Sequence, residues 1–398
     1  MSKRRIVVVG GGAVGLATAW RILEREPGVQ LTLVEKEPGV GRHQTGNNSG
    51  VLHCGLHYRT GSRKARLAVR GIRQMTAFCL EHGIAHDICG NLVVATSEDQ
   101  IPRLNSLLER GTANGLAGLQ IVSPEEMREI EPHAGGVAGL RVPEEGIVDY
   151  PAVCGTLKGE IEKLGGRVVL NAAVRKLARN AQGWRVETAA GDFAADVVVT
   201  CAGLQADRVA RLSGVRPDVK IVAFRGDYYK LRPEREYLVR NLIYPLADPK
   251  FPFLGVHFTR MVRGGIEAGP NAVLALDREG YGKLDFDFRD AADALTFPGL
   301  WRFAGKHFTT SLNEVRRAFS RALFCRTLQR LVPELREDDL VAGGSGVRAQ
   351  AMRPDGSLVE DFEYVVQDRV VHVLNAPSPA ATASLAIGEE IAELALAQ

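Results

Sequence analysis

Residues 6–35 have the sequence IVVVGGGAVGLATAWRILEREPGVQLTLVE, and this stretch decides the fold. The run at 6–9 is short, apolar and β-branched, which is typical of a strand buried on both faces. Residues 13–24 place apolar side chains along one side of a helix, and residues 31–34 form a second apolar strand. This order predicts the first unit of a Rossmann-like, dinucleotide-binding α/β fold.

Three glycines, Gly10, Gly12 and Gly15, join the first strand to the helix at G-x-G-x-x-G spacing. Gly10 permits the tight turn, Gly12 lets the backbone approach a pyrophosphate, and Gly15 lets helix and strand pack closely. The helix N-terminus, with Ala13 and Val14, offers unpaired N–H groups and a partial positive charge to the phosphates. We therefore expect these five residues to bind the cofactor.

Glu35 ends the second strand about 20 residues beyond the glycines, where the fingerprint expects an acid. A carboxylate there accepts hydrogen bonds from the adenosine ribose and repels an extra 2′-phosphate. Lys36 follows it and is included in the predicted cofactor site. The alternative is a glycine-rich turn in another kind of α/β protein, and the fingerprint alone does not distinguish FAD from NAD.

The composition is that of a soluble globular protein: 398 residues, 45% hydrophobic and 24% charged, enough for two or three domains. A net charge of +3 from balanced totals argues against nucleic acid as a partner. Six scattered cysteines without metal-ligand spacing predict free thiols in a reducing compartment and no metal. No uninterrupted apolar run reaches the roughly 18 residues of a spanning helix. We expect a cytoplasmic protein, with peripheral contact at the inner face of the cell membrane left open.

The fold class predicted is α/β (α+β overall), with a Rossmann-like FAD/NAD(P)-binding domain and a second, mostly antiparallel β substrate domain capped by helices. Strands alternate with turns at 217–287, and residues 295–332 are strongly helical with a break near His307. The expected cofactor domain is discontinuous, and this favours FAD because a simple NAD domain is usually one piece. It comprises residues 1–85, 142–215 and 336–398, and the substrate domain comprises 86–141 and 216–335.

Seven further motifs resemble one family along essentially the whole chain. They are NSGVLH (48–53), FRGDY (224–228), FPFLGVHFT (251–259), GPNAV (269–273), GVRAQA (346–351), LVEDF (358–362) and NAPSPAAT (375–382). Together they resemble the L-2-hydroxyglutarate dehydrogenases/oxidases of the D-amino-acid-oxidase-like FAD superfamily. The resemblance implies FAD and oxidation of the C2 hydroxyl of L-2-hydroxyglutarate to 2-oxoglutarate, with hydride transfer to flavin N5. The mitochondrial leader of animal members is lacking, so we expect a bacterial, cytosolic protein.

A dianionic substrate, here a 2-hydroxy dicarboxylate, needs cationic groups at two positions, and arginine binds carboxylates best through its two-pronged geometry. Arg348 lies in a glycine-flanked turn, and the resemblance places an arginine near this point against the substrate carboxylate or flavin. Arg225 is a second candidate, whose alternative is an ion pair inside the substrate domain. Tyr228 can donate a hydrogen bond, although tyrosines at sheet edges are more often structural.

Loss of the hydroxyl proton requires a base, which near neutral pH is usually histidine. His257 lies in an otherwise apolar strand expected at 253–258, a placement also typical of a core histidine. His53 lies in the polar, glycine-rich segment 39–61, which we expect to face a ligand rather than to be a solvated loop. Either histidine could be the base or could orient a carboxylate.

The turn at 377–382 opens the last helix, expected at 380–396, whose N-terminus would stabilise negative charge at the pyrimidine edge of the flavin. The alternative is an ordinary proline-started helix. The remaining expected cofactor contacts are Thr45, Asn48, Ser49, Gly50, Val174, Ala202, Gly203, Arg348, Pro379, Ala380, Ala381 and Thr382.

Two other functions stay open at this point. One is a related flavin enzyme acting on another 2-hydroxy acid, an amino acid or glycerol 3-phosphate, and a single carboxylate site with no base would favour an amine oxidase. A non-catalytic FAD- or NAD-binding regulatory protein would bind cofactor without reduction by any 2-hydroxy acid. The electron acceptor is also open, because oxygen, a quinone or another carrier would each fit, and a quinone would bring the protein to the membrane.

Overall fold

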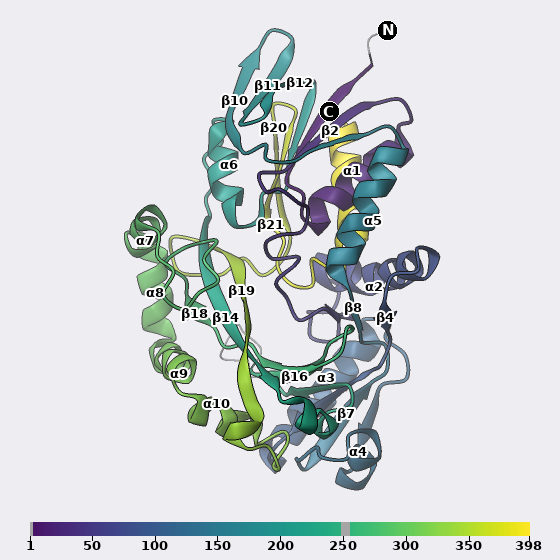
Figure 1. Cartoon of the computed structure of the whole chain (residues 1–398), viewed down its shortest axis with the longest axis vertical. Coiled ribbons are helices and arrows are strands. Elements are labelled where there is room, and N and C mark those ends of the chain that lie inside the picture. Colours follow the sequence, from purple (N-terminus) through teal and green to yellow (C-terminus); the bar gives the residue numbers. More distant parts are fainter. Residues whose placement is uncertain (1–2, 248–254) are drawn as a thin grey trace.

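The computed structural model describes residues 3–247 and 255–398 of the chain. Two sheets dominate the molecule and lie one above the other in Figure 1. The upper sheet is largely parallel and the lower one is larger and mostly antiparallel, with helices along its outer side. The predicted α/β architecture with a second antiparallel β sheet is confirmed.

The upper sheet collects strands from three distant parts of the chain. β1 lies at its centre, its neighbours on both sides run parallel to it, and β21 runs parallel to β13, whereas the edge strand β20 is antiparallel to β21. In spatial order the strands are β20 (Glu363–Gln367), β21 (Val370–Asn375), β13 (Val197–Thr200), β1 (Arg5–Val9), β2 (Gln30–Val34) and β9 (Arg167–Val169). The centre of this sheet is apolar on both faces, as the run at 6–9 predicts.

Helix α1 (Ala13–Arg25) begins where β1 ends, and glycine makes this close approach sterically allowed. Gly10 has a φ of +110°, and a Cβ there would lie 2.3 Å from the carbonyl oxygen of Cys201. A Cβ on Gly15 would lie 2.0 Å from the carbonyl oxygen of Gly10. Any side chain at either position would push the helix away from the strands, so the turn geometry depends on these two residues.

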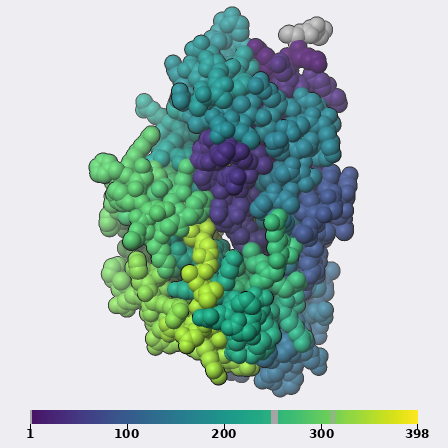
Figure 2. Space-filling view, in the orientation of Figure 1, coloured from purple at the N-terminus to yellow at the C-terminus, as the bar shows by residue number. Residues whose placement is uncertain are grey.

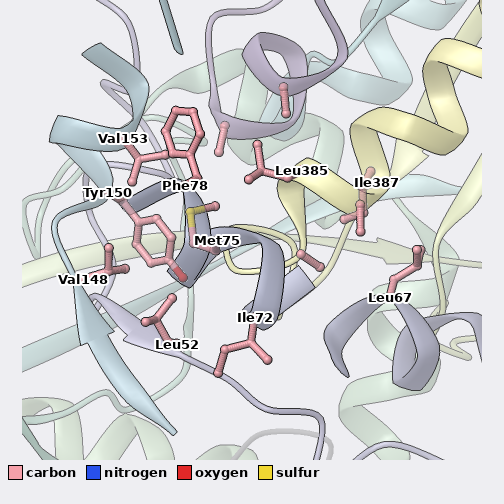
Figure 3. Packing of buried hydrophobic residues seen from close by; sticks show 14 of the residues in the cluster. Leu52, Leu67, Ile72, Met75, Phe78, Val148, Tyr150, Val153, Leu385 and Ile387 are labelled. Carbon is pink, nitrogen blue, oxygen red and sulfur yellow. The ribbon is translucent and has the colours of Figure 1, made fainter. Parts of the chain in front are cut away.

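Three more helices complete this half of the core. They are α2 (Arg63–Glu81), α5 (Tyr150–Lys163) and α11 (Ser384–Leu396). Figure 3 shows Met75 and Phe78 of α2 beside Tyr150 and Val153 of α5, and Leu385 of α11 closes the same cluster. The closing helix starts at Ser384 rather than at 380 because residues 378–383 form turns.

The lower sheet is built from long antiparallel pairings, and β15 with β5 is its parallel pair. Its strands in order are β18 (Val273–Leu274), β14 (Lys220–Leu231), β17 (Ile266–Gly269), β16 (His257–Arg260), β15 (Leu242–Pro245), β5 (Asn91–Ala95), β7 (Ala138–Val142) and β6 (Gln120–Val122). Strand β19 (Leu340–Met352) pairs with β14 along nearly its whole length. The motif residues 251–254, including the start of the strand expected at 253–258, lie outside the described residues.

The division into two discontinuous domains remains a prediction, but sheet membership bears on one boundary. Residues 336–398 were assigned to the cofactor domain, whereas β19 belongs to the lower sheet. If domains are drawn by sheet, the last cofactor-binding segment begins after Met352.

The remaining elements are short. They are the strands β10 (Val174–Asn180), β11 (Gly183–Thr188) and β12 (Gly191–Ala195), the strands β3 (Val51–Leu52), β8 (Gly146–Val148) and β4 (His86–Asp87), and the helices α3 (Ile101–Ala113), α4 (Pro124–Ile130) and α6 (Ala206–Leu212). The helical region expected at 295–332 breaks at His307, as predicted, and elsewhere. Its helices are α7 (Phe288–Leu295), α8 (Pro298–Lys306), α9 (Phe308–Phe319) and α10 (Arg321–Leu328). Within the described ranges, no helix has the length and apolarity needed to cross a bilayer.

A buried histidine in the upper sheet makes stability depend on pH. The Nδ1 atom of His372 in β21 lies 2.9 Å from Oγ1 of Thr200, and its Nε2 atom lies 2.9 Å from Oγ of Ser213. Burial lowers the pKa of His372 to about 4. The unfolded chain takes up this proton near pH 6.5, so falling pH between 6.5 and 4 favours unfolding.

We expect the free energy of unfolding to fall over this window, by up to about 3 kcal/mol from His372 alone. The variant His372→Gln cannot titrate and should show a shallower dependence. Urea unfolding of both proteins at several pH values between 7 and 4.5 measures the slopes. Equal slopes in the two proteins would contradict the assignment.

Candidate active site

One cavity of about 830 Å³ is lined by residues from both sheets. Figure 2 shows segment 39–61, in purple, meeting the yellow-green β19 on the visible face. The approach is close, because a Cβ on Gly346 would lie 2.4 Å from the carbonyl oxygen of Asn47. The predicted site residues that line this cavity are Gly10, Gly12, Ala13, Val14, Gly15, Glu35, Lys36, Thr45, Asn48, Ser49, His53, Val174, Ala202, Gly203, Tyr228, Arg348, Pro379, Ala380, Ala381 and Thr382.

The glycine turn forms one end of the cavity and fits a bound pyrophosphate. Gly12 is the N-cap of α1, and a Cβ built there would meet only Oγ1 of Thr45, at 3.4 Å. The N–H of Ala13 donates to the same hydroxyl, at 3.2 Å. A side chain at Gly12 would therefore fill space in front of the helix N-terminus, where phosphate oxygens bind.

Glu35 is held rigidly at the end of β2. Its Oε2 accepts a 2.5 Å hydrogen bond from the N–H of Gly11, and its Oε1 accepts one of 2.9 Å from the N–H of Glu37. Lys36 lines the cavity as well, but its ammonium group lies 2.6 Å from a carboxylate oxygen of Glu37 and 2.6 Å from one of Glu279. Because these acids neutralise its charge, a cofactor contact from Lys36 needs a rearrangement of this cluster.

The predicted residue Gly50 is not part of the cavity wall. It has a φ of +67°, and a Cβ there would lie 2.9 Å from the carbonyl oxygen of Val148. Its N–H donates to Oδ1 of Asn48 at 2.8 Å. Gly50 therefore lets the ligand-facing segment pass close to β8 and holds Asn48 in position.

Positive charge gathers at the other end of the cavity. Arg348 of β19 lies opposite Phe224 of β14, and Tyr228 lies further along β14. Burial raises the pKa of Tyr228, and the guanidinium of Arg348 opposes that rise, so the two groups lie close together. Lys64, in the first turn of α2, adds a second cation to the wall.

Burial and a neighbouring cation destabilise the charged form of Lys64. Burial lowers its pKa to about 8, the Asp361 and Glu360 carboxylates oppose this shift, and the Arg348 charge adds to it. Its ammonium group donates to the carbonyl of Glu360 at 3.2 Å and lies 4.7 Å from the centre of the Tyr58 ring. A bound carboxylate would relieve the repulsion between the two cations.

Arg225 does not reach the cavity. Gly226 and Tyr228 line it, and because side chains alternate along a strand, Arg225 points to the other face. Its Nε lies 3.0 Å from Oδ1 of Asp227, and the guanidinium also donates to the carbonyl of Gly282. The structure thus places it in the ion pair that the sequence left open as its alternative role, not at the substrate.

His53 is backed by a buried carboxylate that the sequence did not single out. Its Nδ1 lies 3.6 Å from Oε1 of Glu145, which is 1% exposed. Burial opposes ionisation of Glu145, but His53, His57 and the amide of Asn91 outweigh it and lower the pKa of the carboxyl to about 2. These neighbours therefore favour the ionised form of the Glu145 carboxyl.

The backbone of His53 is fixed from another direction. Its N–H donates to Oγ1 of Thr382 at 3.2 Å, and that hydroxyl lies 2.7 Å from the hydroxyl of Tyr150. The backbone of His53 is therefore held by Thr382 near the C-terminus, whereas its imidazole faces Glu145 from the turn between β7 and β8.

His257 is buried and lies outside the lining of the cavity. Its Nδ1 donates to the carbonyl of Gly255 at 2.9 Å, and its ring centroid lies 4.0 Å from that of Tyr244. Burial lowers the pKa of His257 to about 3, and the charges of Arg348 and His53 act in the same direction. The ring is therefore neutral under ordinary conditions.

Glu145 and Lys64 are the functional candidates that sequence reasoning missed. Glu145 follows another glutamate in a turn, a pattern typical of exposed acids. Lys64 lies among arginines at a helix start, where a basic side chain is usually solvated. Only the folded arrangement distinguishes them from surface charges.

Comparison with known proteins identifies the family. Residues 5–394 match the family model described as FAD dependent oxidoreductase. The chain is 48% identical to an L-2-hydroxyglutarate dehydrogenase of Indibacter alkaliphilus, over 98% of both chains. The chain belongs to the L-2-hydroxyglutarate dehydrogenase family of FAD-dependent oxidoreductases.

Another relative of this chain is the human mitochondrial L-2-hydroxyglutarate dehydrogenase, 42% identical over 98% of this chain and 88% of that protein. Among solved structures, an L-α-glycerophosphate oxidase of Mycoplasma pneumoniae with FAD bound has a TM-score of 0.82 at 22% identity. It covers 100% of this chain and 95% of that one. A glycine oxidase of Geobacillus kaustophilus has a TM-score of 0.74 at 19% identity, covering 100% and 96%. These likenesses establish the fold, and FAD is the cofactor of the family.

Valine at position 12 tests the cofactor end of the cavity. We expect Gly12→Val to lower the FAD bound per polypeptide by at least about tenfold, because the side chain fills the pyrophosphate position. The flavin absorbance of purified protein measures this content. Gly155→Val is the matched control, since a Cβ at that position in α5 has no neighbour within 4 Å. Full flavin content in Gly12→Val would contradict the assigned phosphate site.

Proposed function

We propose that this chain oxidises L-2-hydroxyglutarate to 2-oxoglutarate at the end of the cavity formed by Arg348, Lys64 and His53. The observation that carries the proposal is that two neighbouring cations, Arg348 and Lys64, line the same cavity as a histidine backed by a carboxylate. The family relationship supports the same substrate, since relatives of that name are 41–48% identical. When bound, FAD supplies a two-electron acceptor whose N5 takes the C2 hydrogen as hydride.

Substrate binding is assigned to the two cations. The Arg348 fork suits the carboxylate next to the reacting carbon, because a bidentate contact fixes orientation as well as position. Lys64 suits the distal carboxylate as a point charge on a flexible stem. A diacid satisfies both cations, whereas a monocarboxylate leaves one of them unpaired beside the other.

His53 is assigned the role of general base for the C2 hydroxyl. It lies on the cavity wall, and the adjacent Glu145 carboxylate stabilises the imidazolium that forms when the hydroxyl proton is taken up. His257, neutral and bonded through Nδ1 to Gly255, fits a role in packing beneath the site. Tyr228 is assigned to hydrogen bonding of the substrate beside Arg348.

The other functions fit this arrangement less well. An oxidase of amino acids or glycerol 3-phosphate shares the fold, but a single anionic group would not use both Arg348 and Lys64. A regulatory FAD-binding protein would have no use for a histidine supported by a buried carboxylate. The acceptor of the electrons is proposed to be oxygen, a quinone or another carrier.

Anaerobic reduction of the flavin tests the proposal. The purified FAD-bound protein is mixed with L-2-hydroxyglutarate, D-2-hydroxyglutarate, glycine and glycerol 3-phosphate in turn, and the flavin absorbance is followed. We expect bleaching with L-2-hydroxyglutarate and formation of one 2-oxoglutarate per flavin. Bleaching by one of the other compounds, with none by L-2-hydroxyglutarate, would overturn the assignment.

Lys64 should determine the preference for a diacid. We expect Lys64→Met to lower kcat/KM for L-2-hydroxyglutarate by about 10- to 100-fold, as is usual for the loss of a charged hydrogen bond. Turnover of L-2-hydroxybutyrate, which lacks the second carboxylate, should change little. Lys158→Met, which removes a surface pair with Glu162, is the matched control. An equal loss with both substrates would contradict a contact with the distal carboxylate.

The same lysine predicts a pH dependence. Its pKa of about 8 in the free protein means that the cation is lost as pH rises through 8. The value of kcat/KM for the diacid should therefore fall above about pH 8, because this parameter reports the free enzyme. Lys64→Arg stays charged and should move the fall to higher pH, and an unmoved profile would exclude Lys64 as its source.

Comparison of variants at His53 and His257 tests which histidine is the general base. We expect His53→Gln to lower kcat by about 10²- to 10⁴-fold while FAD stays bound. His257→Gln should affect stability more than kcat, because the ring is buried and outside the cavity wall. Rapid-mixing measurements of flavin reduction give both rates, and a larger loss in His257→Gln with FAD retained would exchange the two roles.

A further inference from the structure

A short turn, residues 277–282, joins the lower sheet to the cofactor-binding half of the molecule. It lies between β18 and α7, and Figure 1 shows both of these elements just below α6. The base of the turn is closed, because the N–H of Asp287 donates to the carbonyl of Leu276 at 3.1 Å. Glu279, within the turn, lines the active-site cavity. We refer to residues 277–282 as the clasp.

Glu279 ties the clasp to the cofactor-binding half at two points. One carboxylate oxygen lies 2.6 Å from the ammonium nitrogen of Lys36, just after β2, and the other accepts a 2.8 Å hydrogen bond from the amide of Gln205, just before α6. The ammonium group of Lys36 also lies 2.6 Å from Glu37 and 2.8 Å from Nε2 of His43. Burial lowers the pKa of Lys36, but its hydrogen bonds to Glu279 and Glu37 outweigh this effect and raise the pKa, so the ammonium group is charged.

Tyr281 makes the second set of contacts across the two halves. Its hydroxyl lies 3.3 Å from Nδ1 of His43, and the two rings are stacked with centroids 6.3 Å apart. The carbonyl of Tyr281 accepts a 2.5 Å hydrogen bond from the hydroxyl of Ser345 in β19. The clasp therefore contacts the ligand-facing segment 39–61 on one side and the lower sheet on the other.

Arg278 anchors one end of the clasp in the interior. It is 3% exposed, and its guanidinium lies 2.6 Å from Oδ1 of Asp207 in α6 and 2.9 Å from Oδ2 of Asp293 in α7. Opening this contact would leave buried charges unpaired, which is strongly unfavourable. The pair of Lys36 and Glu279 is different, since 31% and 29% of the two side chains are exposed and water can solvate both charges when they part. The clasp thus has a fixed contact at Arg278 and a releasable contact at Glu279.

The releasable contact lies beside residues assigned to the cofactor. Lys36 directly follows Glu35, whose carboxylate is assigned to the adenosine ribose, and both residues line the cavity together with Glu279. Contacts between the two halves of the molecule close the cavity on this side. A dinucleotide can therefore enter or leave here only when these contacts part.

We infer that the clasp holds FAD in the cavity and that Glu279 is its latch. Separation of Glu279 from Lys36 and Gln205 lets the turn move away from β2 while the Arg278 anchor stays in place, and this movement opens a route for the cofactor. Lys36 thereby acts on the cofactor through Glu279 rather than by direct contact. The inference requires the FAD site but neither the proposed substrate nor the proposed reaction.

Rates of FAD release and loading test the inference. Release is followed as the rise in flavin fluorescence after the FAD-bound protein is diluted, and loading as the fall in fluorescence when FAD is added to the resulting apoprotein. We expect Glu279→Gln to speed both rates by about tenfold, as is usual for the loss of a hydrogen bond between charged groups, with a smaller change in Kd. A latch controls the barrier in both directions, whereas a residue that only contacts FAD changes mainly the release rate.

Variants of the partner residue and a salt series test whether the ion pair is the latch. Lys36→Met should also speed both rates, and the double variant Lys36→Met, Glu279→Gln should gain little beyond either single change, because all three lose the same contact. Raising the salt concentration should speed both rates in wild type and change them less in Glu279→Gln. Glu162→Gln is the matched control, since it removes a surface ion pair with Lys158 on α5.

Trypsin measures the opening of the clasp without reference to FAD, because Lys283 directly follows the clasp and is exposed. Cleavage of the apoprotein after Lys283 should be about tenfold faster in Glu279→Gln than in wild type, and the temperatures of thermal unfolding should match.

Three results would overturn the inference: release and loading rates unchanged in both latch variants, faster release with an unchanged loading rate, or equal cleavage after Lys283. The second of these would make Lys36 and Glu279 ordinary contacts of the cofactor.

Discussion

The buried carboxylate of Glu145 is the interaction on which the geometry of the site depends. It lies in the turn between β7 of the lower sheet and β8, accepts a 2.7 Å hydrogen bond from Asn91 of β5, and faces His53 after β3. An ionised carboxylate in the interior is unfavourable unless it is paired and hydrogen-bonded. These partners keep it ionised, so the lower sheet and the histidine cannot shift apart without leaving a charge unpaired.

From this contact the two halves of the cavity take their relative positions. The upper sheet supplies the glycine turn and Glu35, which fit the dinucleotide, and β14 and β19 of the lower sheet supply Tyr228 and Arg348. Lys64 and His53 come from segments that connect the two. The same cavity thus holds phosphate-binding backbone at one end and paired cations at the other, an arrangement suited to a flavin and a small diacid.

Much of the fold and of the cofactor site could be predicted from the sequence where interactions between neighbouring residues determine the structure. The steric demands at Gly10 and Gly15 act within one turn, so the strand, the helix and most of the cofactor-facing residues follow from the sequence. The roles of residues whose surroundings depend on long-range packing were harder to predict. Arg225 was a candidate because it lies at the start of a strand expected to point toward the flavin, but in the fold its side chain pairs with Asp227 on the opposite face of the strand.

Glu145 and Lys64 could not be selected from sequence because their burial comes from distant segments. The exposed apolar face of α9, which includes Phe308 and Phe319, has the same periodicity as a buried face, so its direction is visible only in the fold. The pairing of β19 with β14 was not predicted from the sequence, because it joins residues more than a hundred positions apart. Contacts of this kind depend on topology rather than on propensity.

A crystal structure of the FAD-bound protein with 2-oxoglutarate tests the central claim most directly. The account predicts one carboxylate on the guanidinium of Arg348, the other on the ammonium of Lys64, and the C2 oxygen within hydrogen-bond reach of His53. A diacid bound elsewhere, or bound here with Arg348 and Lys64 touching neither carboxylate, would contradict it.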